Sequence, residues 1–318
     1  MRHLSMGSLT IPILLLSGCV AFYQKKDEVT VREPGHRSLG APLPVAGEAK
    51  KHWQYGSLAE ASYRRTPKGK EADGEASECP PVDSVLKAHG WERWKDFPDD
   101  GLLKKISVSH LRVEVWEQRE TNSVVVSFGG TVFKSGKDWK SNLRWFTPGH
   151  KDEYTYIVQV FGPAFLEEMK RRLALPDGAR LKNVSLYATG HSLGGGLAQQ
   201  FAYSLPLNDI GLRVKHVYAF DPSPVTGFFS VDTKTRDVNR LGLLVDRIYE
   251  RGEILALVRS LTSFFWKPSA VNAEIRGVRY NLFYTPNPFA GHSMVNLSCQ
   301  LRVAAGEPPS GRGVVGSE

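Results

Sequence analysis

The stretch LYATGHSLGGG, residues 186–196, decides the fold. Its first half has the composition of a buried strand, and a helical pattern follows from Leu193 to Leu205. A Gly-x-Ser-x-Gly motif between a strand and a helix is typical of a nucleophile elbow, a strained turn whose neighbouring residues must be small. The helix N-terminus directly after the turn stabilises negative charge. We therefore expect Ser192 to act as a nucleophile.

Extended and helical patterns alternate on both sides of this turn. An apolar residue recurs at every fourth position from Ile157 to Leu173, which predicts a helix with one buried stripe. Strands are predicted at 111–115, 124–128, 184–189, 214–220, 243–249 and 278–284, and the first two form a hairpin around residues 121–122. The alternation predicts an α/β fold, in which helices cover both faces of a mainly parallel central sheet.

The composition is that of one large globular domain. The chain has 318 residues, of which 41% are hydrophobic, so it can bury a sizeable core. A collagen, a coiled coil and a disordered chain are excluded, and no run of 18 apolar residues predicts an ordinary transmembrane helix. The net charge of +8 favours anionic partners. Because the basic residues are spread along the chain, we expect membrane lipid and no nucleic acid.

The N-terminus has the pattern of a secretion signal. Arg2 precedes a short apolar run that ends in LSGC, residues 16–19. This ending resembles the bacterial lipobox, which implies that residues 1–18 are a lipoprotein signal peptide and that acylated Cys19 holds the protein at a membrane. Val20, where an aspartate would retain such a lipoprotein at the inner membrane, favours the outer membrane of a bacterial envelope, facing the periplasm or the surface. An ordinary cleaved signal is the alternative.

Three further segments complete the predicted domain organisation. Residues 19–50, from the lipidated cysteine onward, are rich in proline and glycine and are predicted to be a flexible tether. Residues 51–305 are expected to form the folded domain, and residues 306–318 a loose tail. Cys79 and Cys299 are left in an oxidising compartment, where they either form one disulfide or remain free thiols.

A nucleophilic serine needs a base that is itself oriented by a carboxylate. In a fold with this elbow the chain order is serine, acid, histidine, and of the nine histidines only His216 and His292 follow Ser192. His216 lies inside the predicted strand 214–220 and precedes every suitable acid. Elimination therefore predicts His292, in the loop after the last strand, as the general base. Scattered histidines and the absence of a paired metal-ligand motif predict no metal.

Residues 55–301 resemble the class 3 (fungal-type) lipase family, which implies an α/β-hydrolase fold. The elbow is one shared motif, and FGGT at 128–131 is similar to the Phe-Arg-Gly-Thr motif of that family, with Gly129 in place of the arginine. The resemblance implies that the backbone N–H groups of Thr131 and Leu193 form the oxyanion hole.

The resemblance leaves two candidates for the acid. Class 3 lipases place an aspartate after the next-to-last strand, where RIYERGEIL, residues 247–255, has Glu253. The strand before it ends in an Asp-Pro pair at Asp221, which instead resembles the pancreatic lipase family, whose acid ends this strand. Asp221 is our first choice, because a short carboxylate at a strand end is better fixed, and Glu253 is the alternative.

Together these residues predict a serine hydrolase that cleaves carboxylic esters of lipids through an acyl-enzyme, as a triacylglycerol lipase, phospholipase or carboxylesterase without a cofactor. Residues 132–146, basic and aromatic, are predicted to be a lid or else a helix with its tryptophans in the core. Residues 228–239 and 255–266 are candidate walls of an acyl pocket. The alternative is a catalytically silent envelope lipoprotein that binds a lipid or a partner, and the sequence identifies no partner protein.

Overall fold

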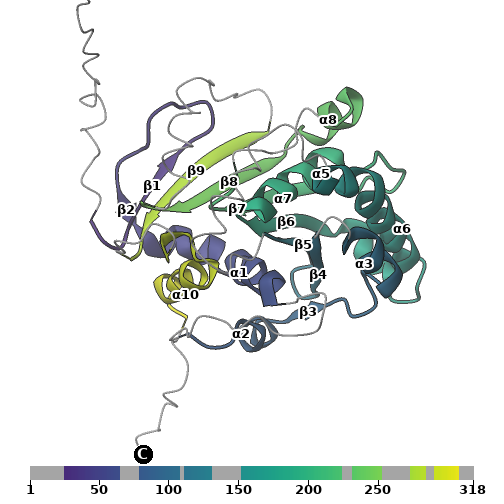
Figure 1. Ribbon diagram of the computed structural model, residues 1–318, viewed down its shortest axis with the longest axis horizontal. Coiled ribbons are helices and arrows are strands. Elements are labelled where there is room, and N and C mark those ends of the chain that lie inside the picture. Colours follow the sequence, from purple (N-terminus) through teal and green to yellow (C-terminus); the bar gives the residue numbers. More distant parts are fainter. Residues whose placement is uncertain are drawn as a thin grey trace, which may run out of the picture.

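A computed structural model describes residues 25–64, 79–107, 111–130, 152–223, 231–252, 273–283 and 290–307. Within these ranges one nine-stranded sheet has the order β2-β1-β9-β8-β7-β6-β5-β4-β3 (Figure 1). The strands are β1 (Glu28–Arg32), β2 (Leu43–Pro44), β3 (Trp91–Arg93), β4 (Arg112–Gln118), β5 (Ser123–Gly129), β6 (Ser185–His191), β7 (Val214–Phe220), β8 (Leu244–Glu250) and β9 (Glu274–Asn281).

Helices precede, connect and follow these strands. They are α1 (Val45–Arg64), α2 (Val82–Ala88), α3 (Asp100–Ser107), α5 (Asp152–Tyr156), α6 (Gly162–Leu173), α7 (Leu193–Ser204), α8 (Thr233–Asn239) and α10 (Met294–Ala305). A π-helical segment, Ile157–Phe161, joins α5 to α6, and 3-10 turns span Gly178–Asn183 and Ala290–His292. In the described part of the chain, no helix combines the length and hydrophobicity that a membrane crossing requires.

The five strands from β5 to β9 run parallel, and antiparallel strands flank them on both sides. The predicted hairpin is the antiparallel pair β4–β5. Helices α1, α2 and α10 lie on one face of the sheet, while α5, α6 and α7 lie on the other (Figure 1). The predicted α/β fold with a parallel centre between two helical layers is therefore confirmed.

Both faces of the central strand β5 are buried, which explains the apolar run in its sequence. Every residue of β5 is buried. On the α7 face, the predicted stripe supplies Phe161 and Phe165, whose rings pack against Phe201 of α7. On the α1 face, the core contains Trp53 and Leu297. The central strands therefore lie between two apolar layers, and Ser192 and Asp221 follow the ends of two of these strands.

The N-terminal boundary of the domain needs correction. Residues 19–50 were predicted to be a flexible tether, but β1 lies within this range and α1 already begins at Val45. Val29 and Val31 are 0% and 7% exposed, and β1 pairs with β9 from Glu28 opposite Asn281 onward. The prolines and glycines made the short alternating pattern of β1 hard to recognise in the sequence. This strand pairs with β9 and extends the sheet beyond it.

Two features hold the C-terminal helix. A disulfide joins Cys79 to Cys299 of α10, with their Cα atoms 5.7 Å apart. Gly306 ends α10 with a φ of 88°, and Glu307 directly after it contacts the His89 ring nitrogen Nε2 at 3.1 Å. The helix that follows the predicted base is therefore tied to the chain around α2.

Candidate active site

Ser192 occupies the turn between β6 and α7. Its φ of 56° and ψ of −121° are unusual for a residue with a side chain, and such conformations are held by their surroundings. The N–H of Ser192 donates to the Phe220 carbonyl at 2.9 Å, and the Ser192 carbonyl accepts from Ser223 N–H at 2.9 Å. The turn is thus fixed to the end of the neighbouring strand β7.

The two glycines of the Gly-x-Ser-x-Gly motif allow three backbone segments to meet. A Cβ on Gly194 would overlap the carbonyl oxygen of Phe128, at the end of β5. A Cβ on Gly190 would overlap the Gly194 carbonyl oxygen. The motif is therefore required by backbone packing between β5, β6 and α7.

His292 lies beside the serine. A hydrogen bond of 3.0 Å joins His292 Nε2 and Ser192 Oγ, and the two residues are 5% and 7% exposed. His292 ends the turn Ala290–His292, and α10 begins two residues later with Ser293 as its N-cap. A buried serine in hydrogen-bond contact with an imidazole has the geometry for proton transfer from the hydroxyl.

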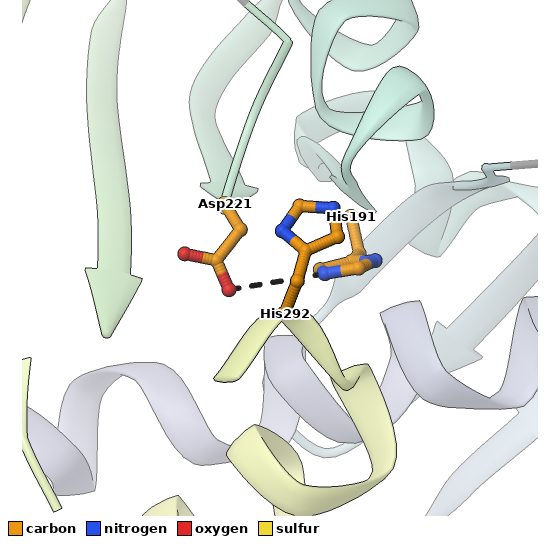
Figure 2. A group of neighbouring side chains, drawn as sticks. All are labelled: His191, Asp221 and His292. Carbon is orange, nitrogen blue, oxygen red and sulfur yellow. Dashed lines mark ion pairs between the residues drawn. The ribbon is translucent and has the colours of Figure 1, made fainter. Parts of the chain in front are cut away.

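Asp221, the first-choice acid, directly follows β7 and is fully buried. Its φ is 39°, its N–H donates to the Ile248 carbonyl at 2.7 Å, and its Oδ1 accepts from Glu250 N–H at 3.2 Å. Figure 2 shows its carboxylate beside the ring of His292. Ligand atoms of Asp221, His292 and His191 all lie within 4.8 Å of one another. Asp221 thus stands where an acid can orient the base.

His191, which the sequence analysis passed over, packs against the same pair. Its ring centroid is 4.6 Å from that of His292, and its Nε2 is 3.8 Å from Asp221 Oδ2. The side chains of His191, Asp221 and His292 could together contact a metal ion. His292 Nε2 contacts Ser192 Oγ, which is the geometry expected of a base and a nucleophile, and we assign no metal to this cluster.

Of the two residues predicted to form the oxyanion hole, Leu193 lies within the described residues. Leu193 is the first residue of α7, so its N–H belongs to the helix N-terminal groups that lack an intrahelical acceptor. Tyr63, at the end of α1, forms a hydrogen bond with the backbone of Gly130, and its hydroxyl lies 2.8 Å from His191 Nδ1. Burial raises the pKa of Tyr63, so its hydroxyl stays protonated. Tyr63 therefore supports the segment that leads into Thr131.

Close packing explains why position 129 is a glycine. A Cβ on Gly129 would lie 2.9 Å from the Ser62 carbonyl oxygen and 3.0 Å from Arg112 Cβ. Arg112 stands opposite Gly129 on β4, and its Nη1 donates to the Tyr63 carbonyl at 3.5 Å. An arginine from the neighbouring strand therefore fills the space beside Gly129.

Several predicted features lie outside the described residues. They are Cys19, the signal peptide 1–18, the lid 132–146 with Thr131 before it, Glu253, the segment 255–266 and the tail from 308. Of the predicted pocket wall 228–239, the described part contains α8, which packs against α7.

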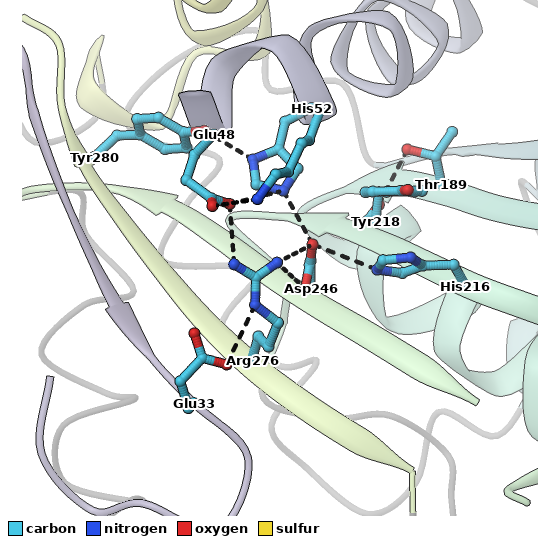
Figure 3. Close-up of polar contacts among 10 residues, drawn as sticks. Glu33, Glu48, His52, Thr189, His216, Tyr218, Asp246, Arg276 and Tyr280 are labelled. Carbon is cyan, nitrogen blue, oxygen red and sulfur yellow. Dashed lines mark hydrogen bonds and ion pairs between the residues drawn. The ribbon is translucent and has the colours of Figure 1, made fainter. Parts of the chain in front are cut away.

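A second histidine–carboxylate cluster lies on the α1 face of the sheet (Figure 3). Asp246 Oδ2 is 3.0 Å from His52 Nε2 and 3.3 Å from His216 Nε2, and Arg276 Nη1 donates to it at 3.1 Å. The hydroxyl of Thr189, also drawn there, donates to the Tyr218 carbonyl at 3.0 Å. His216, rejected as the base because of its place inside a strand, belongs to this structural network.

Comparisons with known proteins point to lipases. Residues 125–226 match the model of the family described as lipase (class 3). No curated protein matches the chain. The matched region begins in β5 and includes both Ser192 and Asp221.

Three solved lipase structures illustrate the similarity. The Rhizomucor miehei lipase propeptide complex has 16% identity and a TM-score of 0.41, over 70% of this chain and 64% of that chain. Lip2 lipase from Yarrowia lipolytica has 17% identity and a TM-score of 0.41, over 70% and 75%. Lipase from Rhizopus microsporus var. chinensis has 15% identity and a TM-score of 0.46, over 80% and 86%. The chain thus spans just under two thirds of the first of these.

Proposed function

We propose that the protein is a serine hydrolase that cleaves carboxylic esters of lipids with Ser192, His292 and Asp221. The observation that carries this proposal is the 3.0 Å contact between His292 Nε2 and Ser192 Oγ on a strained strand–helix turn. Such a turn presents the hydroxyl beside the helix N-terminus, where a tetrahedral oxyanion is stabilised.

The reaction proceeds in two acyl transfers. Ser192 Oγ attacks the ester carbonyl while His292 Nε2 accepts its proton, and the proton then passes to the leaving alcohol. Water, deprotonated by His292, attacks the acyl-enzyme and releases the carboxylic acid and the free serine. The N–H groups of Leu193 and Thr131 stabilise the oxyanion in both steps.

Asp221 is the proposed acid because its position is well determined. It is fully buried, and hydrogen bonds to the end of β8 hold both its main chain and its carboxylate. A fixed carboxylate selects one tautomer of the base and stabilises the imidazolium that forms. Glu253 remains the alternative acid, and substitutions of Asp221 and Glu253 distinguish the two.

The substrate class is proposed to be lipid esters, with acylglycerols and phospholipids as the first candidates. The match of residues 125–226 to class 3 lipases and the net charge of +8 support this choice. We also propose that Cys19 anchors the protein in a bacterial envelope. The disulfide between Cys79 and Cys299 supports an oxidising compartment outside the cytosol.

The test is hydrolysis of p-nitrophenyl esters of increasing acyl length, and of phospholipid in mixed micelles, by the protein without its first 19 residues. We expect activity that Ser192→Ala abolishes. Ser204→Ala is the matched control, because Ser204 is a buried serine at the opposite end of the same helix. If the parent hydrolyses none of these substrates and a fluorophosphonate does not label Ser192, the proposal is wrong and the silent lipoprotein replaces it.

A further inference from the structure

Glu250, the last residue of β8, contacts both Asp221 and the start of the chain segment that leads from β9 to His292. Its N–H donates to Asp221 Oδ1 at 3.2 Å. Its side-chain Oε1 accepts from the N–H of Leu282 at 2.9 Å and of Phe283 at 3.4 Å. We propose that Glu250 is a positioning residue, which holds Asp221 and the segment leading to His292 in one catalytic arrangement. This inference rests on the proposed function.

The contact to Leu282 and Phe283 occurs where the sheet ends. Strand β9 stops at Asn281, so these two residues are the first of the connection from β9 to His292. Leu282 is 2% exposed, and a buried N–H without an acceptor is costly. The Glu250 carboxyl supplies this acceptor and thereby fixes the direction in which the chain leaves the sheet.

The Glu250 carboxyl is neutral at pH 7, so it places no second negative charge beside Asp221. Glu250 is 1% exposed, and burial, with a further contribution from the charge of Asp221, raises its pKa to about 8. Hydrogen bonds from Leu282 and Phe283 act in the opposite direction without overcoming burial. At pH 7 the carboxyl is therefore protonated. Oε2, which has no hydrogen-bond partner within the described residues, is the oxygen that can carry the proton.

The titratable groups around Glu250 come from both neighbouring strands. Asp221 acts on it from the end of β7, and Tyr280 of β9, itself buried, is coupled to it by charge. Arg251 contributes a backbone hydrogen bond. Ionised Glu250 would repel the Asp221 carboxylate in a buried setting, so the positioning is expected to weaken as pH rises through about 8.

Two variants separate the hydrogen bonds from the titration. Glu250→Gln keeps an oxygen acceptor for the two N–H groups and cannot ionise, whereas Glu250→Ala removes the acceptor. At pH 7 we expect kcat of Glu250→Gln to stay close to the parental value. We expect Glu250→Ala to lose roughly 10- to 100-fold in kcat with little change in KM, because catalytic groups move while substrate contacts remain.

The pH profile gives a second measurement. The parent is expected to lose kcat as pH rises through about 8, while Glu250→Gln keeps its activity there. Glu114→Gln is the matched control, since Glu114 is a buried carboxylate on β4 that bonds Arg93. This control is expected to leave the alkaline part of the profile unchanged.

A readout that needs no catalysis separates this inference from the proposed function. Amide hydrogen exchange at Leu282 and Phe283, measured in the Ser192→Ala background, should accelerate in Glu250→Ala and remain slow in Glu250→Gln. If the parent is inactive but shows this exchange pattern, the proposed hydrolase function is wrong, while the hydrogen bonds from Leu282 and Phe283 to Glu250 are supported. The positioning role is wrong if Glu250→Ala keeps the parental kcat and the parental exchange rates. It is also wrong if Glu250→Gln loses kcat at alkaline pH in the same way as the parent.

Discussion

Ser192 and Asp221 both have a positive φ, which few residues other than glycine adopt. Their φ values are 56° and 39°, and each residue directly follows one of the adjacent strands β6 and β7. Positive φ costs free energy, which persists only where the surroundings enforce it. Here the Phe220 carbonyl holds Ser192 and the Ile248 carbonyl holds Asp221. The strained pair is thus stabilised by three neighbouring strand ends.

The identity of the acid can be tested at this scale. Asp221→Asn should lower turnover on the order of 10⁴-fold, because an amide no longer stabilises the imidazolium or enforces its tautomer. Glu253→Gln should cost far less. The measurement is kcat on a p-nitrophenyl ester, with thermal unfolding to show that each variant is folded. If Glu253→Gln loses more turnover than Asp221→Asn, Glu253 is the acid of the triad. If both variants lose only a little turnover, and by the same amount, the proposed triad is wrong.

The elbow glycines predict a stability difference. Gly194→Ala places a methyl group on the Phe128 carbonyl oxygen, so it should lower the free energy of unfolding by about 2 kcal/mol or more. Gly47→Ala is the matched control, because Gly47 lies in α1 with nothing within 4 Å of the added methyl, and it should be neutral or stabilising. Urea unfolding measures both, and equal stability of the two variants would contradict the packing argument.

At the scale of elements, α1 is attached to the sheet by polar side chains as well as by its core. His52 of α1 bonds Tyr280 of β9 at 2.7 Å and Asp246 of β8 at 3.0 Å. Glu48, one turn earlier in α1, accepts from Arg276 at 3.0 Å (Figure 3). Because Tyr63 near the end of α1 forms a hydrogen bond with the backbone of Gly130, this attachment also positions that backbone segment.

The network predicts an acid-sensitive stability. Burial alone would raise the pKa of Asp246, but hydrogen bonds from His216 and His52 outweigh it and lower the pKa well below its usual range. The ionised group therefore stabilises the fold above pH 3.8, its ordinary pKa, and this contribution is lost as pH falls through the lower native pKa. Asp246→Asn should cost about 3 kcal/mol at pH 7 and less below pH 4.

Urea unfolding of the parent and of Asp246→Asn at pH 7 and at pH 3 measures this difference. Asp237→Asn is a suitable control, since Asp237 is an exposed carboxylate of α8 that contacts Arg240 at 3.5 Å. The control should change little at either pH. A cost of Asp246→Asn that is independent of pH would contradict the proposed linkage.

At the scale of the whole molecule, the disulfide closes most of the chain into one loop. Cys79 and Cys299 are 220 residues apart, and in the chain-entropy model a loop of this length stabilises the fold by about 5 kcal/mol. Reduction, or the double change Cys79→Ser and Cys299→Ser, should lower the unfolding temperature while leaving 25 °C activity intact. Thermal scans with and without reductant measure this, and a reductant effect in the double serine variant would contradict the assignment.

Local patterns explain why the centre of the fold could be predicted. β5 contains an apolar run, residues 124–126, and the elbow motif joins a strand to a helix within eleven residues of sequence. β1 could not be found in this way, because its partner β9 lies far away in the sequence and prolines surround its short alternation. The predicted boundary at residue 51 was wrong for this reason.

The site was predictable as far as it depends on motif and chain order. Ser192 and His292 follow from those two, whereas the acid depends on which strand end faces the imidazole, and that is a tertiary property. Glu250 and Tyr63 carry no local signal, since their partners lie on other elements. Glu250 lies three residues before the alternative acid Glu253, and no motif marks its position.

The pairing of β1 with β9 also determines where the chain enters the fold. Glu28 stands opposite Asn281, the last residue of β9, so the chain joins the sheet at the edge where the parallel strands end. Strand β1 is three positions from β7 in the sheet, which is about 14 Å from the strand that carries Asp221. If Cys19 carries the lipid, residues 20–27 reach at most roughly 30 Å. The anchor would then keep the end of the sheet that carries Ser192 and Asp221 close to the membrane that holds it.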